Sequence, residues 1–421
     1  MLELNYRIAC LIFAITKGNV MDILIVGNGF DIAHGLNTKY KDFLDYCTKN
    51  SLEDCQYGLS EIKRIRETNL WFKHFVSRCD EMGNNWIDLE AEIFNAIKYI
   101  SSNQPTGELD SPNSAFRRVF YAIPTNNCLF SFYNLQDIYK PIKEVENGID
   151  FRAAESSFDE NFVNLKGYMF APIIARPDLF NVLIQNPKAL VTFLYDQLRE
   201  FTHAFEEYLQ KVELPKLKDV KFHLNFEEGY NSRGVSDLFL LSFNYTDTCE
   251  RLYAENSDRR GFNMKKVMYI HGKIHQDNNC NLVLGTKSFY EDAIKPSDNT
   301  IDTSFAIFQK HHQRHKYNTI ETYQEFLRFL TNPRMTATPV FHIIGHSLDE
   351  SDHNILKHIL LAHDKAIIKL YYHDEASQDA LIKNITKIIS EKEVMARVQL
   401  IAQHDPQRGI LKPRNSQYSL A

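Results

Sequence analysis

The sequence predicts an α/β fold in which a parallel, doubly wound sheet is interrupted by a large helical insertion. The first observation is a continuous apolar run, Asp22 to Val26, that ends at a glycine and is typical of a strand buried on both faces. The second is the alternation of strand-like and helix-like segments after residue 235, which indicates parallel strands joined by helices. The third is the near absence of strand signals from residue 51 to 234. The first strand must therefore join the C-terminal half of the chain across the insertion.

These patterns divide the chain into five segments. We expect an N-terminal extension at 1–20, a sheet domain from 21–50 and 235–405, a helical insertion at 51–234 and a C-terminal tail at 406–421. Residues 8–15 form an apolar octet, which is too short to span a bilayer and lacks the surroundings of a signal peptide. Met21 directly precedes the first expected strand.

Composition favours an ordinary globular protein. The chain has 421 residues, of which 44% are hydrophobic and 24% charged, values typical of a protein with a real core. The net charge of −6 gives no basic field, so nucleic-acid binding is not expected. None of the seven cysteines forms a C-x-x-C pair, which argues against a zinc module and favours reduced thiols in the cytoplasm. We therefore expect a cytoplasmic chain without a membrane segment or a metal.

Most individual elements can be assigned from periodicity. Further strands are expected at Leu238 to Phe243, Lys266 to Ile270, Leu282 to Leu284, Val340 to Ile344, Ile367 to Tyr372 and Arg397 to Ile401. Helices are expected over 39–49, 59–67, 70–79, 86–101, 187–212, 247–255, 301–331, 352–363 and 375–391. Thr38 has the residue type and position of an N-cap for the first of these helices.

The first strand ends in the sequence Gly27-Asn28-Gly29-Phe30-Asp31. Glycines at a strand-to-helix junction let backbone approach a ligand, and a helix N-terminus favours anions. The third glycine of the dinucleotide fingerprint is absent, so the motif is only partial. Asp31 would repel a phosphate but could accept hydrogen bonds from ribose hydroxyls. The alternative is that Asp31 caps the next helix.

Two later strands also end in polar residues. Asn244 and Asp247 follow one strand, and His271 follows the next. Ligands of open α/β sheets bind outside the carboxyl ends of the strands, and a histidine there can act as a general base. The alternatives are that Thr246 or Asp247 caps a helix and that His271 is structural.

A third strand ends in the sequence Gly345-His346-Ser347. Glycine again permits close approach, and Ser347 can bind a phosphate or a ribose. Asp352, which follows, has the position of an N-cap for the helix over 352–363.

Two clusters of titratable residues are not expected to form sites. His311, His312 and His315 are interleaved with basic residues, which disfavour a cation, so this segment is interpreted as a solvated helix face. Glu90 and Glu92 are two residues apart on a helix and point in different directions, although Glu90 or Asp88 could face a pocket individually.

Several segments together resemble the AbiH family of abortive-infection proteins. They are GNGFDIAHGLNTKYKDF at 27–43, WIDLE at 86–90, SFNYTDTCERLY at 242–253, YIHGKI at 269–274, FQKHHQR at 308–314 and GHSLDESD at 345–352. The similar segments occur in order from residue 21 to about 373, so the resemblance covers most of the chain.

AbiH proteins in turn resemble the sirtuin-like fold of NAD-degrading defence effectors. The resemblance implies that Asn244 and His271 are catalytic. It implies nucleotide binding by Gly27, Asn28, Gly29, Phe30, Asp31, Asp247, Gly345, His346 and Ser347. Thr246 stands where the related motif has Asp, and a four-cysteine zinc ribbon is missing, so protein deacylation is not expected.

The resemblance implies an anti-phage protein that hydrolyses the N-glycosidic bond of NAD or a related nucleotide. The alternative is a nucleotide-sensing or protein-interaction module without catalysis. The expected partners are an NAD-like nucleotide as substrate or ligand, a phage-derived trigger and further copies of the chain, with no additional cofactor. A nuclease would need a carboxylate cluster or a basic surface, and neither is evident in the sequence.

Overall fold

The computed structural model describes residues 21–49, 65–66, 69–81, 88–102, 118–121, 131–134, 187–212, 222–224, 236–254, 262–274, 280–288, 303–332, 337–405 and 409–413. The chain divides into two compact units. The sheet unit comprises Met1–Thr38, Leu209–Val283 and Arg314–Ala421, and the helical unit comprises Lys39–Tyr208 and Leu284–Gln313. The predicted extension at 1–20 lies outside the described residues.

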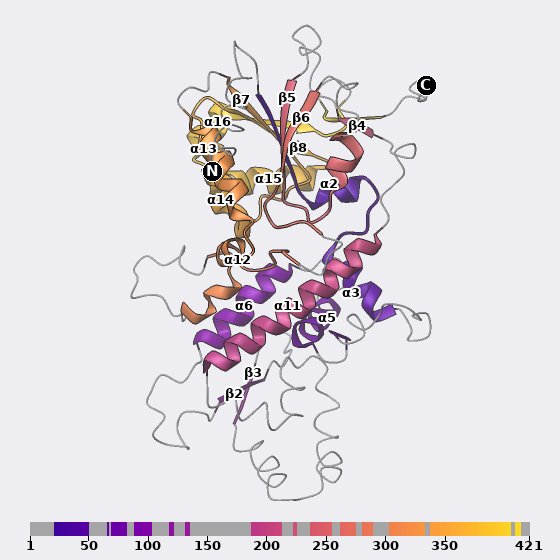
Figure 1. Ribbon diagram of the computed structural model, residues 1–421, viewed down its shortest axis with the longest axis vertical. Coiled ribbons are helices and arrows are strands. Elements are labelled where there is room, and N and C mark those ends of the chain that lie inside the picture. Colours follow the sequence, from indigo (N-terminus) through magenta and orange to yellow (C-terminus); the bar gives the residue numbers. More distant parts are fainter. Residues whose placement is uncertain are drawn as a thin grey trace, which may run out of the picture. The chain divides into compact units, whose positions relative to one another are not determined.

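A six-stranded parallel sheet forms the centre of the sheet unit (Figure 1). Its strands are β1 (Met21–Val26), β5 (Ser236–Ser242), β6 (Phe262–Tyr269), β7 (Pro339–Ile344), β8 (Ile367–Tyr372) and β9 (Val398–Ala402). They lie in the order β6-β5-β1-β7-β8-β9, which is 3-2-1-4-5-6 when the six strands are numbered along the chain. This is the order of a doubly wound, Rossmann-like α/β fold, so the predicted fold class is confirmed.

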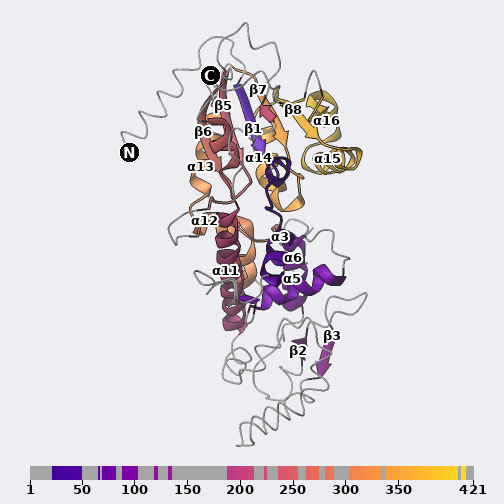
Figure 2. The same cartoon turned by 90° about the vertical axis from the view of Figure 1, so that its right-hand side faces the viewer.

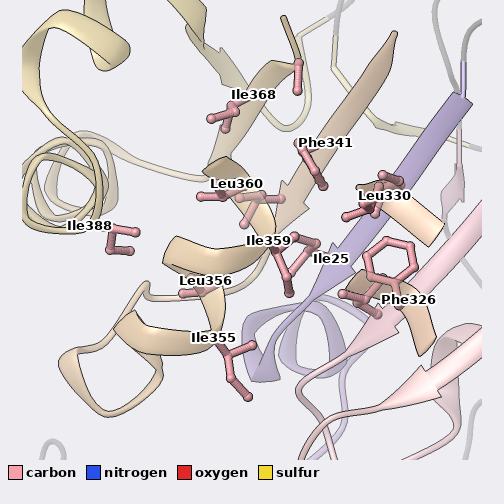
Figure 3. Packing of buried hydrophobic residues seen from close by; sticks show 14 of the residues in the cluster. Ile25, Phe326, Leu330, Phe341, Ile355, Leu356, Ile359, Leu360, Ile368 and Ile388 are labelled. Atoms are coloured by element: carbon pink, nitrogen blue, oxygen red, sulfur yellow. The ribbon is translucent and has the colours of Figure 1, made fainter. Parts of the chain in front are cut away.

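Side chains of β1 alternate between two cores, as a strand buried on both faces requires. Ile23 and Ile25 belong to one core and Leu24 and Val26 to the other. The first core is closed by α13 (Ile320–Leu330), α14 (His353–Leu361) and α15 (Glu375–Ile388), and Figure 3 shows the apolar side chains of α14 packed against those of the strands.

The second core lies on the opposite face of the sheet. It is closed by α2 (Asn28–Ala33), by the π-helix η3 (Glu250–Ala254) and by an antiparallel pair of short strands. This pair is β4 (Phe222–Leu224) with β10 (Leu411–Pro413). β4 lies in the predicted helical insertion and β10 in the predicted tail, where no strand was expected.

Some predicted elements are divided or missing. The helix expected over 301–331 is a 3-10 helix at Thr303–Phe308, followed by α12 (Lys310–Lys316) and α13. The break falls at Asn318, whose φ of 60° is a left-handed conformation that asparagine tolerates. The helix expected over 375–391 ends at Ile388, and Ser390 caps α16 (Glu391–Arg397) by accepting from the Glu393 N–H. The strand expected at 282–284 is absent, because this buried segment hydrogen-bonds to the loop after β6 instead.

The helical unit contains α3 (Tyr40–Lys49), α5 (Leu70–Glu81), α6 (Leu89–Ser102) and α11 (Pro187–Lys211) up to Tyr208 (Figure 2). One face of α11 is lined by buried apolar side chains, and its Phe201 contacts Phe43 and Phe75 at ring-centroid distances of 5.3 and 5.1 Å. The indole of Trp71 donates to the Leu194 carbonyl at 2.8 Å. Of the helix predicted over 59–67, only residues 65–66 are described.

The helical unit also contains a short hairpin that periodicity did not predict. It pairs β2 (Arg118–Tyr121) with β3 (Ser131–Asn134). Among the described residues, none of the helices has the length and apolar character needed to cross a bilayer.

Candidate functional site

The predicted site segments meet at the carboxyl edge of the sheet. Because all six strands are parallel, the residues after β1, β5, β6 and β7 emerge along one edge. β1 and β7 are neighbours, and the chain winds outward in opposite directions from them. The topological switch point, where doubly wound sheets bind ligands, therefore lies between Gly27 and Gly345.

The loops after β1 and β7 contact each other through their backbones. The Gly29 N–H donates to the Gly345 carbonyl at 2.8 Å, and the Gly27 N–H donates to Ile344 at 3.1 Å. A Cβ on Gly27 would lie 2.5 Å from the His346 Cα, and a Cβ on Gly345 would collide with the Phe30 nitrogen. Gly345 also has a φ of +65°, which other residues rarely adopt. In this structure the glycines permit the close approach of one loop to the other.

Asn28 and Phe30 support the first loop. The Asn28 amide donates to the Thr38 carbonyl at 3.3 Å and accepts from the Thr38 hydroxyl at 2.5 Å. α3 begins at Tyr40, so the prediction that Thr38 is its N-cap is wrong. The Phe30 ring is fully buried and lies 4.4 Å from the His34 ring.

Asp31 lies in a buried polar cluster with residues that follow β5. Its carboxylate is 1% exposed, and its Oδ2 accepts from the Thr246 hydroxyl at 2.5 Å. The Thr248 hydroxyl donates in turn to Thr246 at 3.1 Å. The Asp31 side chain makes no capping hydrogen bond to α2, whose N-cap is Gly27, so the alternative interpretation of Asp31 as a helix cap is wrong.

Burial dominates the electrostatics of this carboxyl group. Desolvation raises the pKa of Asp31 to about 6, although hydrogen bonds from Thr246, Thr248 and Asn244 act in the opposite direction. Asp247 is close enough to raise the pKa further by charge repulsion. A carboxyl group that titrates near neutral pH at a sheet edge is a functional candidate.

Asn244 is held at the edge by its backbone. Its N–H and its carbonyl both bind the Ser242 hydroxyl at 3.2 Å. The side chain is buried at 5% exposure, and its Oδ1 has no hydrogen-bond partner within the described structure. A buried acceptor in this state is costly unless a ligand or water satisfies it.

His271 belongs to a second buried cluster. Its Nε2 lies 2.8 Å from Asp352 Oδ1 and 3.0 Å from an Arg314 terminal nitrogen. The same guanidinium nitrogen donates to Asp352 Oδ1 at 2.9 Å. His346 Nε2 is 4.0 Å from the other oxygen of Asp352, and the Phe243 ring makes edge contacts with both imidazoles. All four polar side chains are at most 7% exposed.

Two members of this cluster have contacts that the sequence did not predict. Asp352 is the N-cap residue of α14, as predicted, but its side chain makes no capping hydrogen bond and contacts His271 and Arg314 instead. α12 is not simply a solvated helix face, because Arg314 and Lys310 are buried. His311 and His315 are exposed as expected. The spacing of Lys310 and Arg314 by four residues, which puts them on one helix face, was the signal that could have indicated this.

Asp247 and Ser347 are at the same edge but outside the two clusters. Asp247 lies 3.5 Å from the Lys273 ammonium group, which also pairs with Glu250 at 3.0 Å. Ser347 is exposed, and its carbonyl accepts from the Asn384 amide at 2.9 Å. These two residues are therefore more exposed than the members of the two clusters.

The two clusters together offer hydrogen-bond acceptors, a carboxylate and an imidazole at the ends of adjacent strands. Such a set can orient a hydroxyl group or a water molecule and can accept its proton.

Comparison with known protein families gives a match over most of the chain. The family model described as bacteriophage abortive infection AbiH matches residues 23–373 of the chain. The match begins within β1 and ends one residue beyond β8, so it includes every residue of both clusters. A search among curated proteins found no match.

Proposed function

Because the chain belongs to the AbiH family of bacteriophage abortive-infection proteins, we propose that it protects against phage by hydrolysing the N-glycosidic bond of NAD or a related nucleotide. The observations that carry the proposal are the pairing of His271 with Asp352 and the buried acceptor of Asn244 after the neighbouring strand, both at the carboxyl edge of a doubly wound sheet. This edge is where such sheets bind nucleotides. A sirtuin-like relationship is part of the same proposal.

The reaction makes modest demands on the protein. Nicotinamide leaves as a neutral molecule, so a general acid is unnecessary, while positive charge develops on the ribose. Asn244 Oδ1 would accept a hydrogen bond from a ribose hydroxyl or the attacking water. His271 would accept the proton of that water. The Asp31 carboxylate would accept from ribose hydroxyls and stabilise the developing positive charge.

The rest of the substrate would be held by the loops after β1 and β7. The residues proposed for its sugar and phosphates are Gly27, Asn28, Gly29, Phe30, Asp247, Gly345, His346 and Ser347. Holding this part fixes the reacting carbon relative to the catalytic groups.

Burial of the reacting groups agrees with a restrained effector. Asn244 and His271 are each 5% exposed, so a substrate reaches them only after the surrounding loops have moved apart. A toxic enzyme must remain inactive until infection, and we propose that a phage-derived trigger or assembly of several copies drives this movement.

The test measures NAD in infected cells and with purified protein. Wild type should lower cellular NAD after infection, whereas Asn244→Ala and His271→Gln should slow nicotinamide release by about 100-fold or more, as expected for loss of a general base or an orienting group. His342→Gln is the matched control, because His342 forms another buried pair with Asp22 at 2.9 Å inside the sheet. NAD that stays constant while infected cells are still protected would contradict the proposal.

One observation favours a second candidate, a nucleotide sensor without turnover. Nε2 of His271 already contacts Asp352 and Arg314, so this atom is not available to a substrate in the present arrangement. A sensor would be stabilised by NAD or ADP-ribose without releasing nicotinamide, and protection would survive in His271→Gln.

A further inference from the structure

The contacts of Arg314 limit the charge that the buried His271 cluster can carry. Arg314 comes from α12, Asp352 from the segment before α14 and His271 from the end of β6. The guanidinium nitrogen and the imidazole Nε2 approach the same oxygen, Asp352 Oδ1, at 2.9 and 2.8 Å. They also lie 3.0 Å from each other.

A guanidinium group is permanently charged and has no acceptor. The carboxylate of Asp352 is therefore already balanced by one cation while the imidazole is neutral. Protonation of His271 would place a second cation 3.0 Å from Arg314 in a region where the side chains are at most 7% exposed. An uncompensated buried charge is strongly unfavourable.

Among the described residues, titratable groups of both signs follow β5, β6 and β7. His346, from the loop after β7, lies 4.0 Å from Asp352 Oδ2. Tyr245, after β5, places its ring 6.2 Å from the His271 ring. Lys273, after β6, is positive and pairs with Glu250 and Asp247.

We propose that Arg314 is a positioning residue that holds His271 neutral by neutralising Asp352, so that the imidazole can accept a proton at physiological pH. The use of this neutral imidazole in catalysis rests on the proposed function, whereas its protonation state does not. The His342–Asp22 pair provides a comparison within the same chain, because His342 Nδ1 contacts the Tyr371 hydroxyl at 2.9 Å rather than a guanidinium group.

The direct experiment is an NMR titration of the full chain with isotope-labelled histidine. His271→Gln identifies the signal of His271, and the signal of His342 serves as the internal control. In the wild type the His271 ring should be neutral at pH 7. Arg314→Gln should move its titration midpoint to higher pH by about one to three pH units, Arg314→Lys should restore the wild-type midpoint, and His342 should not respond.

Removing the carboxylate of Asp352 tests the same charge balance by changing its negative member. In Asp352→Asn the imidazole keeps Arg314 as its charged neighbour but loses the carboxylate, so its midpoint should move to lower pH. A His271 ring that is charged at pH 7 in the wild type would overturn the proposal, even if Arg314→Gln fails to fold. So would a downward or absent change in a folded Arg314→Gln protein.

Measurements of nicotinamide release distinguish the proposed role of Arg314 from the proposed hydrolysis of NAD. If nicotinamide is released, the acid limb of the pH profile should move to higher pH in Arg314→Gln. If NMR shows the expected midpoints and wild type never cleaves NAD, the role of Arg314 stands and the proposed hydrolysis fails.

Discussion

Replacing Asp31 by Asn should stabilise the protein at neutral pH. The carboxylate is 1% exposed and its pKa is raised from 3.8 to about 6, chiefly by burial. Asparagine has nearly the same shape, carries no charge and can still accept from the Thr246 hydroxyl through its own oxygen. Rotation of the Asn244 amide would let the two amides pair.

The sign and size of the effect follow from proton linkage. Between about pH 4 and pH 6 the folded state binds the Asp31 proton more tightly than the unfolded state, so the free energy of unfolding falls as pH rises. A pKa increase of 2.2, the difference between about 6 and 3.8, corresponds to about 3 kcal/mol at 1.36 kcal/mol for each pH unit. At pH 7 this stability has been lost from the wild type, whereas Asp31→Asn has no such loss.

Urea unfolding of both proteins at pH 4.5, 5.5 and 7 tests the prediction. The difference between them cancels the other titrating groups, and it should grow with pH up to about 3 kcal/mol in favour of Asp31→Asn. Thr246→Val should change the stability in the opposite direction. Loss of the hydroxyl donor should destabilise the protein with ionised Asp31 by about 1–3 kcal/mol at pH 7. The reasoning is refuted if Asp31→Asn is less stable than wild type at pH 7.

Two further substitutions test the packing around the site, both by thermal unfolding. Gly345→Ala should lower the free energy of unfolding by more than about 3 kcal/mol, because the positive φ costs about 1–2 kcal/mol and the new Cβ collides with Phe30. The control is Gly35→Ala, because Gly35 has a φ of +79° and an added Cβ would have no atom within 4 Å. This variant should show only the cost of the positive φ. Equal losses of unfolding free energy in the two variants would mean that the collision has no cost. Glu90→Gln removes the carboxylate 2.7 Å from the buried Lys310 ammonium group and should cost about 3 kcal/mol. Asp45→Asn, in the more exposed pair with Lys41, should cost under about 0.5 kcal/mol, and a similar loss in both would argue against burial as the cause.

The strands of the sheet could be predicted because their signal is local. β1 and β7 have all six residues buried, and all of these residues are apolar except Asp22 in β1 and His342 in β7. Leu282 to Leu284 are equally buried but satisfy their backbone through loops, and composition cannot distinguish the two outcomes. The division between α12 and α13 depends on the left-handed Asn318, which interrupts a pattern that otherwise continues.

The site was predictable where a polar residue directly follows a strand. Asn244 and His271 lie at the carboxyl edge because strand direction alone places them there. Arg314 and Asp352 are 43 and 81 residues from His271 in sequence, and only the tertiary fold brings them to it. Arg314 also lies among histidines and lysines, which made a buried position hard to distinguish from a solvated helix face.

Stability measurements on Asp31 also bear on why the carboxylate is present. If Asp31→Asn is more stable than wild type by about 3 kcal/mol at neutral pH, the carboxylate does not serve to stabilise the fold. Natural proteins keep such destabilising groups mainly where function needs them. If Asp31→Asn is more stable than wild type and no longer protects cells from phage, the carboxylate acts in the defence reaction. If it is more stable and protection persists, the negative charge of Asp31 is dispensable, and the stabilisation of positive charge on a ribose must come from another part of the site.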